Sequence, residues 1–257
     1  MPDPAVVRLA IITRPGATGE RLVGQLRSEG RDALWFPAFE LGPPPDEGAA
    51  RAALARVGDF DLAIFVSPAA VRAAARLLQA AWPGRTAIGA VGRATAQAVE
   101  QAIRPAQHTA IVVPDDEASG SEAFWAEWKR SGRTAGRVLI LRAQTGRDWL
   151  ADAFAATGAQ VEAQAVYTRT ETVPDPASLA RIAEAVLTGE PAAILFTSSE
   201  AVEALEHQLA GVPGASAWLR HGRALASHER IAERLLAAGY TRVELAAQDN
   251  EGLRAQL

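Results

Sequence analysis

The stretch RPGATGERLVGQLRSEG, residues 14–30, aligns without gaps on RAQTGRDWLADAFAATG, residues 142–158. The alignment pairs Arg14 with Arg142 at its start and a glycine with a glycine at its end. In each copy a short apolar run precedes the arginine, and an amphipathic segment then ends at the glycine, which is typical of a strand followed by a helix. The chain therefore contains an internal duplication, and we expect its two halves to share one plan.

Apolar runs of strand length alternate with amphipathic helical stretches along the whole chain, and a second repeat pairs Phe65–Val71 with Phe196–Val202. This alternation is typical of parallel sheets covered by helices on both faces. We expect an α/β fold with two flavodoxin-like parallel-sheet lobes. The predicted strands are Val7–Ile12, Asp61–Val66, Ala87–Val91, Ala110–Val113, Val138–Leu141, Val161–Val166, Ala192–Phe196, Arg223–Ala226 and Val243–Ala246.

Two extended segments, residues 35–41 and 164–171, interrupt the alternation, and each runs into a proline-rich break. Because they lie at equivalent positions of the repeat, they indicate two crossings between lobes. We expect a lobe of residues 41–166 inserted into another of residues 1–38 plus 172–257, with the two segments as a hinge. A two-strand hinge of this kind leaves a cleft between the lobes, which is the usual place for a ligand.

Composition and charge argue against several classes of protein. The 257 residues are 49% hydrophobic and 22% charged with a formal net charge of -4, so a basic nucleic-acid-binding protein is not expected. No apolar run approaches the roughly 18 residues that span a bilayer, and the start of the chain lacks the pattern of a secretory leader. We therefore expect a cytoplasmic protein, a monomer, without nucleic-acid or membrane partners.

The familiar signatures of metal and nucleotide sites are missing. The chain has no cysteine, and its four histidines do not have metal-ligand spacing, so no metal site is expected. Residues 14–19 have two glycines at the wrong spacing for a dinucleotide loop, and there is no Gly-x-Ser-x-Gly elbow or HExxH motif. A phosphosugar or nucleotide enzyme on a flavodoxin-like sheet would need a phosphate-binding loop, and this sequence does not contain one.

Hydroxyl, glycine and arginine residues follow the predicted strands. In parallel α/β sheets the carboxyl ends of the strands line the ligand crevice, where helix N-termini present unpaired N–H groups. Such a rim suits a polyanionic ligand, although the same residue types also serve as ordinary helix caps. The residues in question are Arg14, Ser67, Thr95, Arg142, Gly146, Arg147, Thr197, Ser198, Ser199, Ser227 and His228.

Six short motifs, in order along nearly the whole chain, resemble those of the uroporphyrinogen-III synthase family. The resemblance implies two α/β lobes joined by a two-strand ladder, an active site in the cleft, and no metal or organic cofactor. It also implies that hydroxymethylbilane is closed to uroporphyrinogen III with inversion of ring D and loss of water. The motifs are Ile11–Pro15, Phe65–Val71, Val91–Ala96, Leu141-Arg142 with Gly146-Arg147, Val166-Tyr167 and Ser227–Ala232.

The resemblance also implies roles for single residues. Tyr167 occupies the family's tyrosine position at the hinge, where a phenol could donate a proton to the departing hydroxyl. Ser67, Thr95, Ser198 and Ser199 would then hydrogen-bond substrate carboxylates. The candidate charge partners are Arg14, Arg142, Arg147 and Arg223, of which Arg14 and Arg142 could instead bind carbonyl oxygens of neighbouring loops.

The second half departs from the family pattern at one place. His228–Ile231 stands where the family has Gly-x-x-Thr, so Ser227 or His228 would have to replace the missing hydroxyl. A competing hypothesis is a two-lobed binding or regulatory module that closes on an anionic small molecule without chemistry.

Overall fold

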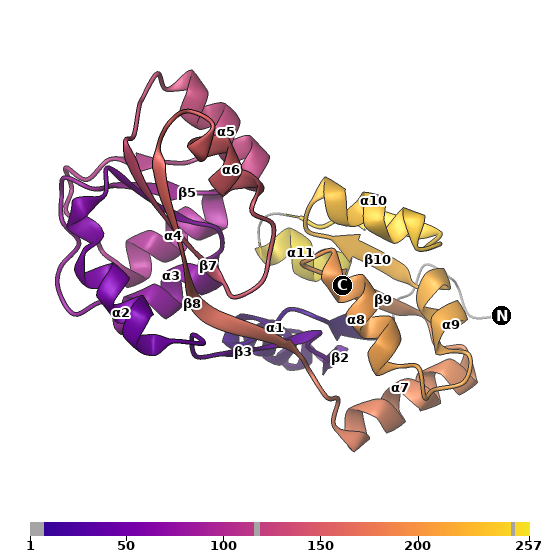
Figure 1. The fold of residues 1–257 in the computed structure, drawn as a ribbon. Helices are drawn as coiled ribbons and strands as arrows, with labels where there is room; N and C mark the ends of the chain where they lie inside the picture. The colour runs from indigo at the N-terminus through magenta and orange to yellow at the C-terminus, as the bar shows by residue number, and fades with distance from the viewer. Residues whose placement is uncertain (1–7, 116–118, 248–249) are drawn as a thin grey trace. The chain divides into compact units, whose positions relative to one another are not determined.

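The computed structural model describes residues 8–115, 119–247 and 250–257; Val7, predicted to begin the first strand, lies outside them. Within it the chain forms two compact units. Unit 1 takes Met1–Leu41 and Thr170–Leu257, and unit 2 takes Gly42–Arg169. Each unit is built on its own mostly parallel sheet (Figure 1). The predicted α/β fold with two parallel-sheet lobes is thus confirmed.

Unit 1 has a five-stranded sheet with the order β11-β10-β9-β1-β2. Every described pair of neighbours in it runs parallel. Its strands are β1 (Leu9–Ile12), β2 (Asp32–Trp35), β9 (Ala192–Phe196), β10 (Arg223–Ala226) and β11 (Arg242–Leu245), and its helices are α1 (Ala17–Ser28), α7 (Pro176–Thr188), α8 (Glu200–Gln208), α9 (Ala215–His221), α10 (Glu229–Ala237) and α11 (Asn250–Gln256).

The sheet of unit 2 has six strands in the order β3-β8-β7-β4-β5-β6, of which most of β3 and the last two residues of β8 belong to unit 1. Among the described residues, neither unit has a helix long and apolar enough to cross a membrane. The strands are β3 (Phe39–Gly42), β4 (Leu62–Phe65), β5 (Ala87–Ala90), β6 (Ile111–Val112), β7 (Arg137–Ala143) and β8 (Gln160–Glu171), and the helices are α2 (Glu47–Ala55), η1 (Val57–Asp59), α3 (Pro68–Leu77), α4 (Arg93–Ala102), α5 (Ser121–Arg130) and α6 (Trp149–Ala155).

The two sheets share one strand order once the internal duplication is applied. Pairing β1 with β7 and β9 with β4, as the sequence repeats do, converts the order β11-β10-β9-β1-β2 into β6-β5-β4-β7-β8. The glycines that end the aligned segments are equivalent too, because Gly30 has φ +78° and Gly158 has φ +87°. Both follow a helix in the left-handed region, where glycine is favoured. The expectation that both halves share one plan is confirmed.

Two strands, β2 and β3, are absent from the predicted set. The segment expected to be a hinge from residue 35 begins inside β2, which pairs in parallel with β1 from Leu9↔Asp32 to Ile12↔Trp35. β2 is an edge strand with a polar first residue and only one fully buried position, so it lacks the continuous apolar run that marks buried strands. That run is present in β9, which the sequence predicts to the residue.

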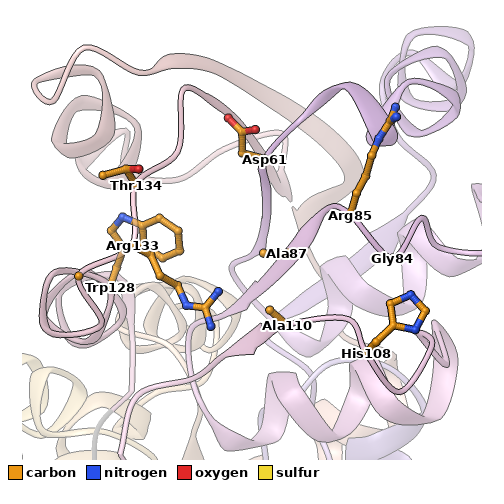
Figure 2. Close-up of a pocket in the computed structure, with 10 residues that line it drawn as sticks. Asp61, Gly84, Arg85, Ala87, His108, Ala110, Trp128, Arg133 and Thr134 are labelled. Atoms are coloured by element: carbon orange, nitrogen blue, oxygen red, sulfur yellow. The ribbon is translucent and has the colours of Figure 1, made fainter.

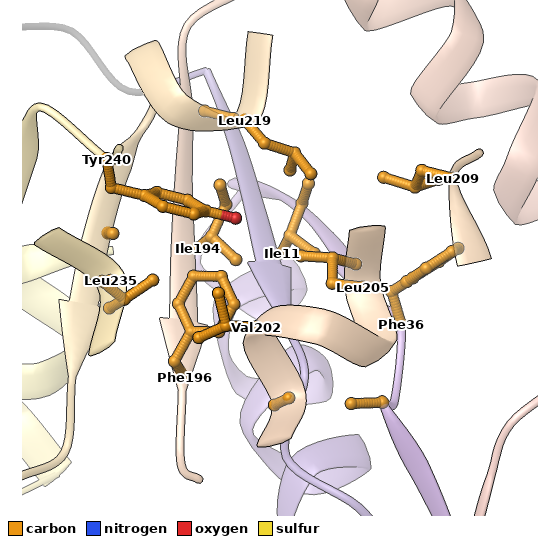
Figure 3. Packing of buried hydrophobic residues seen from close by; sticks show 14 of the residues in the cluster. Ile11, Phe36, Ile194, Phe196, Val202, Leu205, Leu209, Leu219, Leu235 and Tyr240 are labelled. Carbon is orange, nitrogen blue, oxygen red and sulfur yellow. The ribbon is translucent and has the colours of Figure 1, made fainter. Parts of the chain in front are cut away.

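Alternate residues of each strand enter two different cores, one on each face of the sheet. In β1, Leu9 and Ile11 join a cluster with helices α7 to α10, part of which is drawn in Figure 3. Ala10 and Ile12 point the other way and pack with α1 and α11. Unit 2 repeats the arrangement, with α2, α3 and α4 packed on one face and α5 and α6 on the other. Every one of these clusters takes its residues from a single unit.

Two predicted helix starts are present as the local sequence requires. Ser67 precedes the proline that opens α3, and its Oγ accepts a hydrogen bond from Ala70 N at 3.0 Å. Asp175 precedes the proline that opens α7, and its carboxylate accepts from Ser178 N at 2.9 Å. Each cap satisfies one of the N–H groups that a helix leaves unpaired in its first turn.

Residues 42–169 expressed alone should fold and unfold cooperatively, because both core clusters of unit 2 consist of its own residues. The fragment has to extend beyond residue 166, since Tyr167 packs in one of those clusters. A domain of about this size buries enough apolar surface to be stable. Calorimetry should give equal calorimetric and van't Hoff enthalpies. A broad transition without a heat-capacity peak would contradict the independence of this unit.

Candidate functional site

The strand order of unit 2 reverses direction between β4 and β7. From β4 the chain builds outward to β5 and β6, and it then returns to place β7 and β8 on the other side of β4. In open α/β sheets, ligands bind outside the carboxyl ends of the strands at this kind of switch point. The residues that follow β4 and β7 are therefore the candidates for a ligand-binding site in unit 2.

Ser67 and Tyr167 meet at this position. Ser67 follows β4 as the N-cap of α3, and its Oγ lies 3.3 Å from the hydroxyl oxygen of Tyr167, so either oxygen could donate to the other. Tyr167 belongs to β8 and pairs with Ala143 at the end of β7, where the register shifts by one residue. Its backbone oxygen accepts from Gln144 N at 3.0 Å. The two hydroxyls are brought together across β7 although 100 residues separate them.

The ring of Tyr167 is buried, and its hydroxyl faces a serine. The side chain is 8% exposed and packs in the core of unit 2, so the ring is held while its hydroxyl reaches Ser67. Ser67 Oγ also accepts from Ala70 N, so its remaining capacity is to donate its own proton or accept from the phenol. A phenol poised between a serine and an incoming group is able to act as a general acid.

Arg142 holds the loop that follows β7. Its guanidinium donates to Gly146 O at 2.7 Å and to Asp148, and its Nε donates to Ala143 O at 3.3 Å. The side chain is only 13% exposed. Gly146, with φ +140°, adopts a conformation that other residues rarely take. The arginine and the glycine therefore shape this loop, which is the structural alternative that the sequence left open for Arg142.

Arg147 and Thr95 complete the rim of unit 2. Arg147 forms a two-pronged ion pair with Glu122 at the start of α5, and both side chains are about half exposed. Exposed pairs of this kind contribute about 0–1 kcal/mol, so a ligand carboxylate could replace Glu122 at little cost. Thr95 lies in the first turn of α4 and is 3% exposed, and its N–H donates to Gly92 O at 3.0 Å.

Unit 1 presents an equivalent rim of its own, with the switch point between β1 and β9. After β9, Ser198 Oγ accepts from Ala201 N at 3.2 Å, so the hydroxyl caps the entry into α8 beside Thr197 and Ser199. After β1, the Arg14 backbone oxygen accepts from Trp35 Nε1 at 3.0 Å, which fixes the turn into α1. These residues lie at strand ends as the sequence predicts.

His228 stands in this rim at the position where the family pattern has another residue. It is the N-cap of α10, and its Nδ1 accepts from Arg230 N at 3.1 Å. The neighbouring Ser227 donates its N–H to Phe196 O at 3.0 Å, so its backbone extends the pairing of β10 with β9. An imidazole that accepts through Nδ1 carries its proton on Nε2 when neutral.

Arg223 lies at the opposite end of its strand. It is the first residue of β10, whereas Ser227 and His228 follow the last. Its guanidinium makes two bonds to Glu244, at 2.9 and 2.7 Å, and a third to Gln256 O at 2.7 Å. The hydrogen bond to Glu244 raises the pKa of Arg223, and the same bond lowers the pKa of Glu244. Arg223 therefore ties β11 and α11 to the sheet and does not join the rim.

The sequence itself carried the signal for this placement, because Arg223 opens a predicted strand instead of following it. The acidic partners of the arginines carry no comparable signal in the sequence. Asp148 is close to Arg142 in the chain, but Glu122 is 25 residues from Arg147 and reaches it only through the packing of α5 beside the β7–α6 loop. In the described ranges no three histidine or acidic side chains gather closely enough to hold a metal ion.

A pocket of about 400 Å³ lies at the other end of the unit 2 sheet (Figure 2). Asp61, Ala87 and Ala110 line it from the starts of β4, β5 and β6, so it faces away from the strand ends that carry Ser67. Its arginines, Arg85 and Arg133, are exposed to solvent. None of the predicted site residues lines it, and we do not assign the function to it.

Replacing Arg142 with methionine should lower the free energy of unfolding by about 1–3 kcal/mol, because three carbonyl and carboxylate acceptors lose a charged donor. Arg147→Met, at an exposed pair, should lower it by no more than about 1 kcal/mol and serves as the control. Denaturant unfolding of both variants measures the difference. Equal stability of the two variants would show that Arg142 does not anchor the loop.

Known proteins match this chain over most of its length. The family profile described as Uroporphyrinogen-III synthase HemD matches residues 20–254. A uroporphyrinogen-III synthase of Escherichia coli (strain K12) is 30% identical over 256 residues, which cover 95% of this chain and 97% of that protein. A uroporphyrinogen-III synthase of Synechococcus elongatus is 30% identical over 207 residues, 78% of this chain and 74% of that protein.

Solved structures share the fold. The crystal structure of a mutant uroporphyrinogen III synthase from the extremely thermophilic bacterium Thermus thermophilus has a TM-score of 0.63 at 22% identity, covering 98% of this chain and 96% of that one. The crystal structure of uroporphyrinogen-III synthetase from Helicobacter pylori 26695 has a TM-score of 0.55 at 15% identity, covering 96% of each chain. At 22% and 15% identity these similarities show the fold alone.

Proposed function

Because the chain belongs to the uroporphyrinogen-III synthase family, we propose that it cyclises hydroxymethylbilane to uroporphyrinogen III with inversion of ring D and loss of water. The proposal is supported above all by the Ser67–Tyr167 hydroxyl pair at the switch point of unit 2. The substrate is a linear tetrapyrrole rich in carboxylates. Two rims of hydroxyls and helix N–H groups suit the recognition of such a molecule.

The proposed reaction begins when Tyr167 protonates the hydroxyl of the substrate's hydroxymethyl group, so that the C–O bond breaks and water leaves. The azafulvene cation that remains is attacked by the ring D carbon that already carries a substituent. The resulting spiro pyrrolenine then fragments and recloses with ring D reversed. Since the cation forms readily and unaided closure gives the uninverted isomer, the main task of the protein is to hold the chain in the fold that allows inversion.

The residues divide between two tasks in this proposal. Ser67 keeps the phenol of Tyr167 in place and can return a proton to it, since their oxygens are 3.3 Å apart. The carboxylates would be bound by Arg147 and by hydroxyls and N–H groups of both rims. The members of that set are Arg14, Thr95, Thr197, Ser198, Ser199, Ser227 and His228. Arg142 and Gly146 instead shape the loop after β7, and Arg223 has no role in binding.

We further propose that the protein works in the cytoplasm as a monomer and needs neither a metal nor an organic cofactor. The cleft expected from the sequence remains part of this proposal. The charges of the substrate argue for closed surroundings rich in hydrogen-bond donors, because carboxylates bind most strongly where water is excluded.

Adding the protein to freshly made hydroxymethylbilane should divert the product from the type I to the type III isomer. The same result is expected in the presence of a chelator. Separation of the two isomers by chromatography measures the ratio. A ratio unchanged from that of the buffer would contradict the enzymatic function and favour the binding module.

Tyr167→Phe should lower the turnover rate about 10²-fold, the low end for general acid catalysis, with little change in KM. The stability should change by no more than about 1 kcal/mol, because one partly buried hydrogen bond is lost. Steady-state kinetics and thermal unfolding measure the two quantities. A rate within twofold of the parent would remove Tyr167 from the mechanism.

The chain offers a matched control, since its only other tyrosine is Tyr240. Tyr240 is 2% exposed in unit 1, and its hydroxyl has no hydrogen-bond partner among the described residues. Burial raises its pKa, so it is a poor proton donor. Tyr240→Phe should leave turnover unchanged and raise the stability, because removing a buried hydroxyl without a partner relieves a desolvation cost of about 1–3 kcal/mol.

A further inference from the structure

The side-chain amide of Gln208, the last residue of α8, joins three carbonyl oxygens from two distant segments. Its Nε2 lies 3.3 Å from Pro37 O, 3.2 Å from Ala38 O and 2.8 Å from Thr172 O. Carbonyl oxygens only accept, so the amide nitrogen must face them and the amide oxygen must face away. The three acceptors share the two hydrogens of one NH₂ group.

Residues 37–38 and 172 are the places where the chain leaves unit 1 and returns to it. The chain passes from unit 1 to unit 2 after Leu41 and comes back at Thr170. The two segments are bonded directly as well, because Thr172 N donates to Ala38 O at 3.1 Å. Gln208 therefore bonds to both segments with one side chain. We call Gln208 and its three acceptors, at residues 37, 38 and 172, the clasp.

The clasp is connected to Tyr167 through the pairing of β3 with β8. These strands are neighbours in the sheet, and Thr168 N donates to Pro43 O at 3.1 Å. Gly42 lies so close to the partner strand that a Cβ there would be 2.5 Å from Thr168 Oγ1. Tyr167 adjoins this contact and lies five residues before Thr172 in the chain. β8 thus lies between β3 and β7, and Tyr167 itself pairs with Ala143 of β7.

We infer that Gln208 is a positioning residue for Tyr167, holding β3 and β8 so that the phenol meets Ser67. The role rests on the function proposed above. α8 begins at Glu200, directly after Ser198 and Ser199, so one short helix runs from proposed substrate-binding hydroxyls to the clasp. The other contact of α8 with this strand is weak: His207 Nδ1 lies 3.6 Å from Glu171, but both side chains are exposed.

The arrangement is not the one that stability alone would favour. Gln208 Oε1 and Thr172 Oγ1 are both buried and have no hydrogen-bond partner in the described part of the chain. Buried polar atoms without partners cost free energy, and native structures keep few of them.

The test is a double-mutant cycle with Gln208→Met, which keeps the length of the side chain and removes its donors. In the parent background this variant should lower kcat at least about fivefold with KM changed less than about twofold. In the Tyr167→Phe background it should change kcat by less than about twofold, because a residue that acts through the phenol has nothing left to position. Effects that multiply in full, or an unchanged kcat in the parent background, would overturn the inference.

Ala204→Gly is the control for lost helix stability. Ala204 is buried in α8 and has no side-chain donor or acceptor for the clasp, and glycine weakens a helix interior. It should lower Tm at least as much as Gln208→Met does, yet leave kcat within about twofold of the parent. An equal loss of kcat in both variants would reduce Gln208 to a stabilising residue and overturn its positioning role.

Hydrogen exchange at the Thr172 amide separates failure of this inference from failure of the proposed function. Exchange should become at least about tenfold faster in Gln208→Met and stay unchanged in Ala204→Gly, whether or not hydroxymethylbilane is converted. Unchanged exchange in Gln208→Met would overturn the clasp. Faster exchange in a protein without isomer activity would uphold the clasp, while the role in turnover would be overturned together with the proposed function.

Discussion

Parallel pairing of the strands is the constraint from which the site follows. Parallel neighbours need a crossover, and the helix in each crossover returns the chain to the same edge of the sheet. The residues after β4, β5 and β7 in unit 2 therefore share one edge, as do those after β1, β9 and β10 in unit 1. Local chemistry at each strand end, a serine cap or a glycine turn, becomes part of a common rim through this geometry.

The arginines show how tertiary contacts divide residues of one type among different tasks. Arg142 is nearly buried and bonded to its own loop, Arg147 is exposed in an ion pair with Glu122, and Arg223 is bonded to Glu244 at the far end of its strand. An arginine already surrounded by acceptors gains little from a ligand carboxylate. Arg147 is the most exposed of these three side chains.

The internal duplication is distributed over both units. The first repeat contributes β1 and β2 to unit 1 and β4 to β6 to unit 2, whereas the second contributes β7 and β8 to unit 2 and β9 to β11 to unit 1. Each sheet thus combines the opening strands of one repeat with the closing strands of the other. This exchange requires two linking segments, and Gln208 and the β3–β8 pairing act on those segments.

Much of this protein was determined by local sequence. Three local features predicted the α/β class and the shared plan, because each depends on neighbouring residues. They are the apolar runs of β9 and β10, the caps at Ser67 and Asp175, and the repeat of residues 14–30 at 142–158. The edge strand β2, the partners of Arg147 and Arg223, and the meeting of Ser67 with Tyr167 were decided only by tertiary structure. In each of these cases the deciding contact arises from packing or from strand pairing. Similar repeats offer similar local signals, so only the long-range pairing selects which copy of each strand joins which sheet.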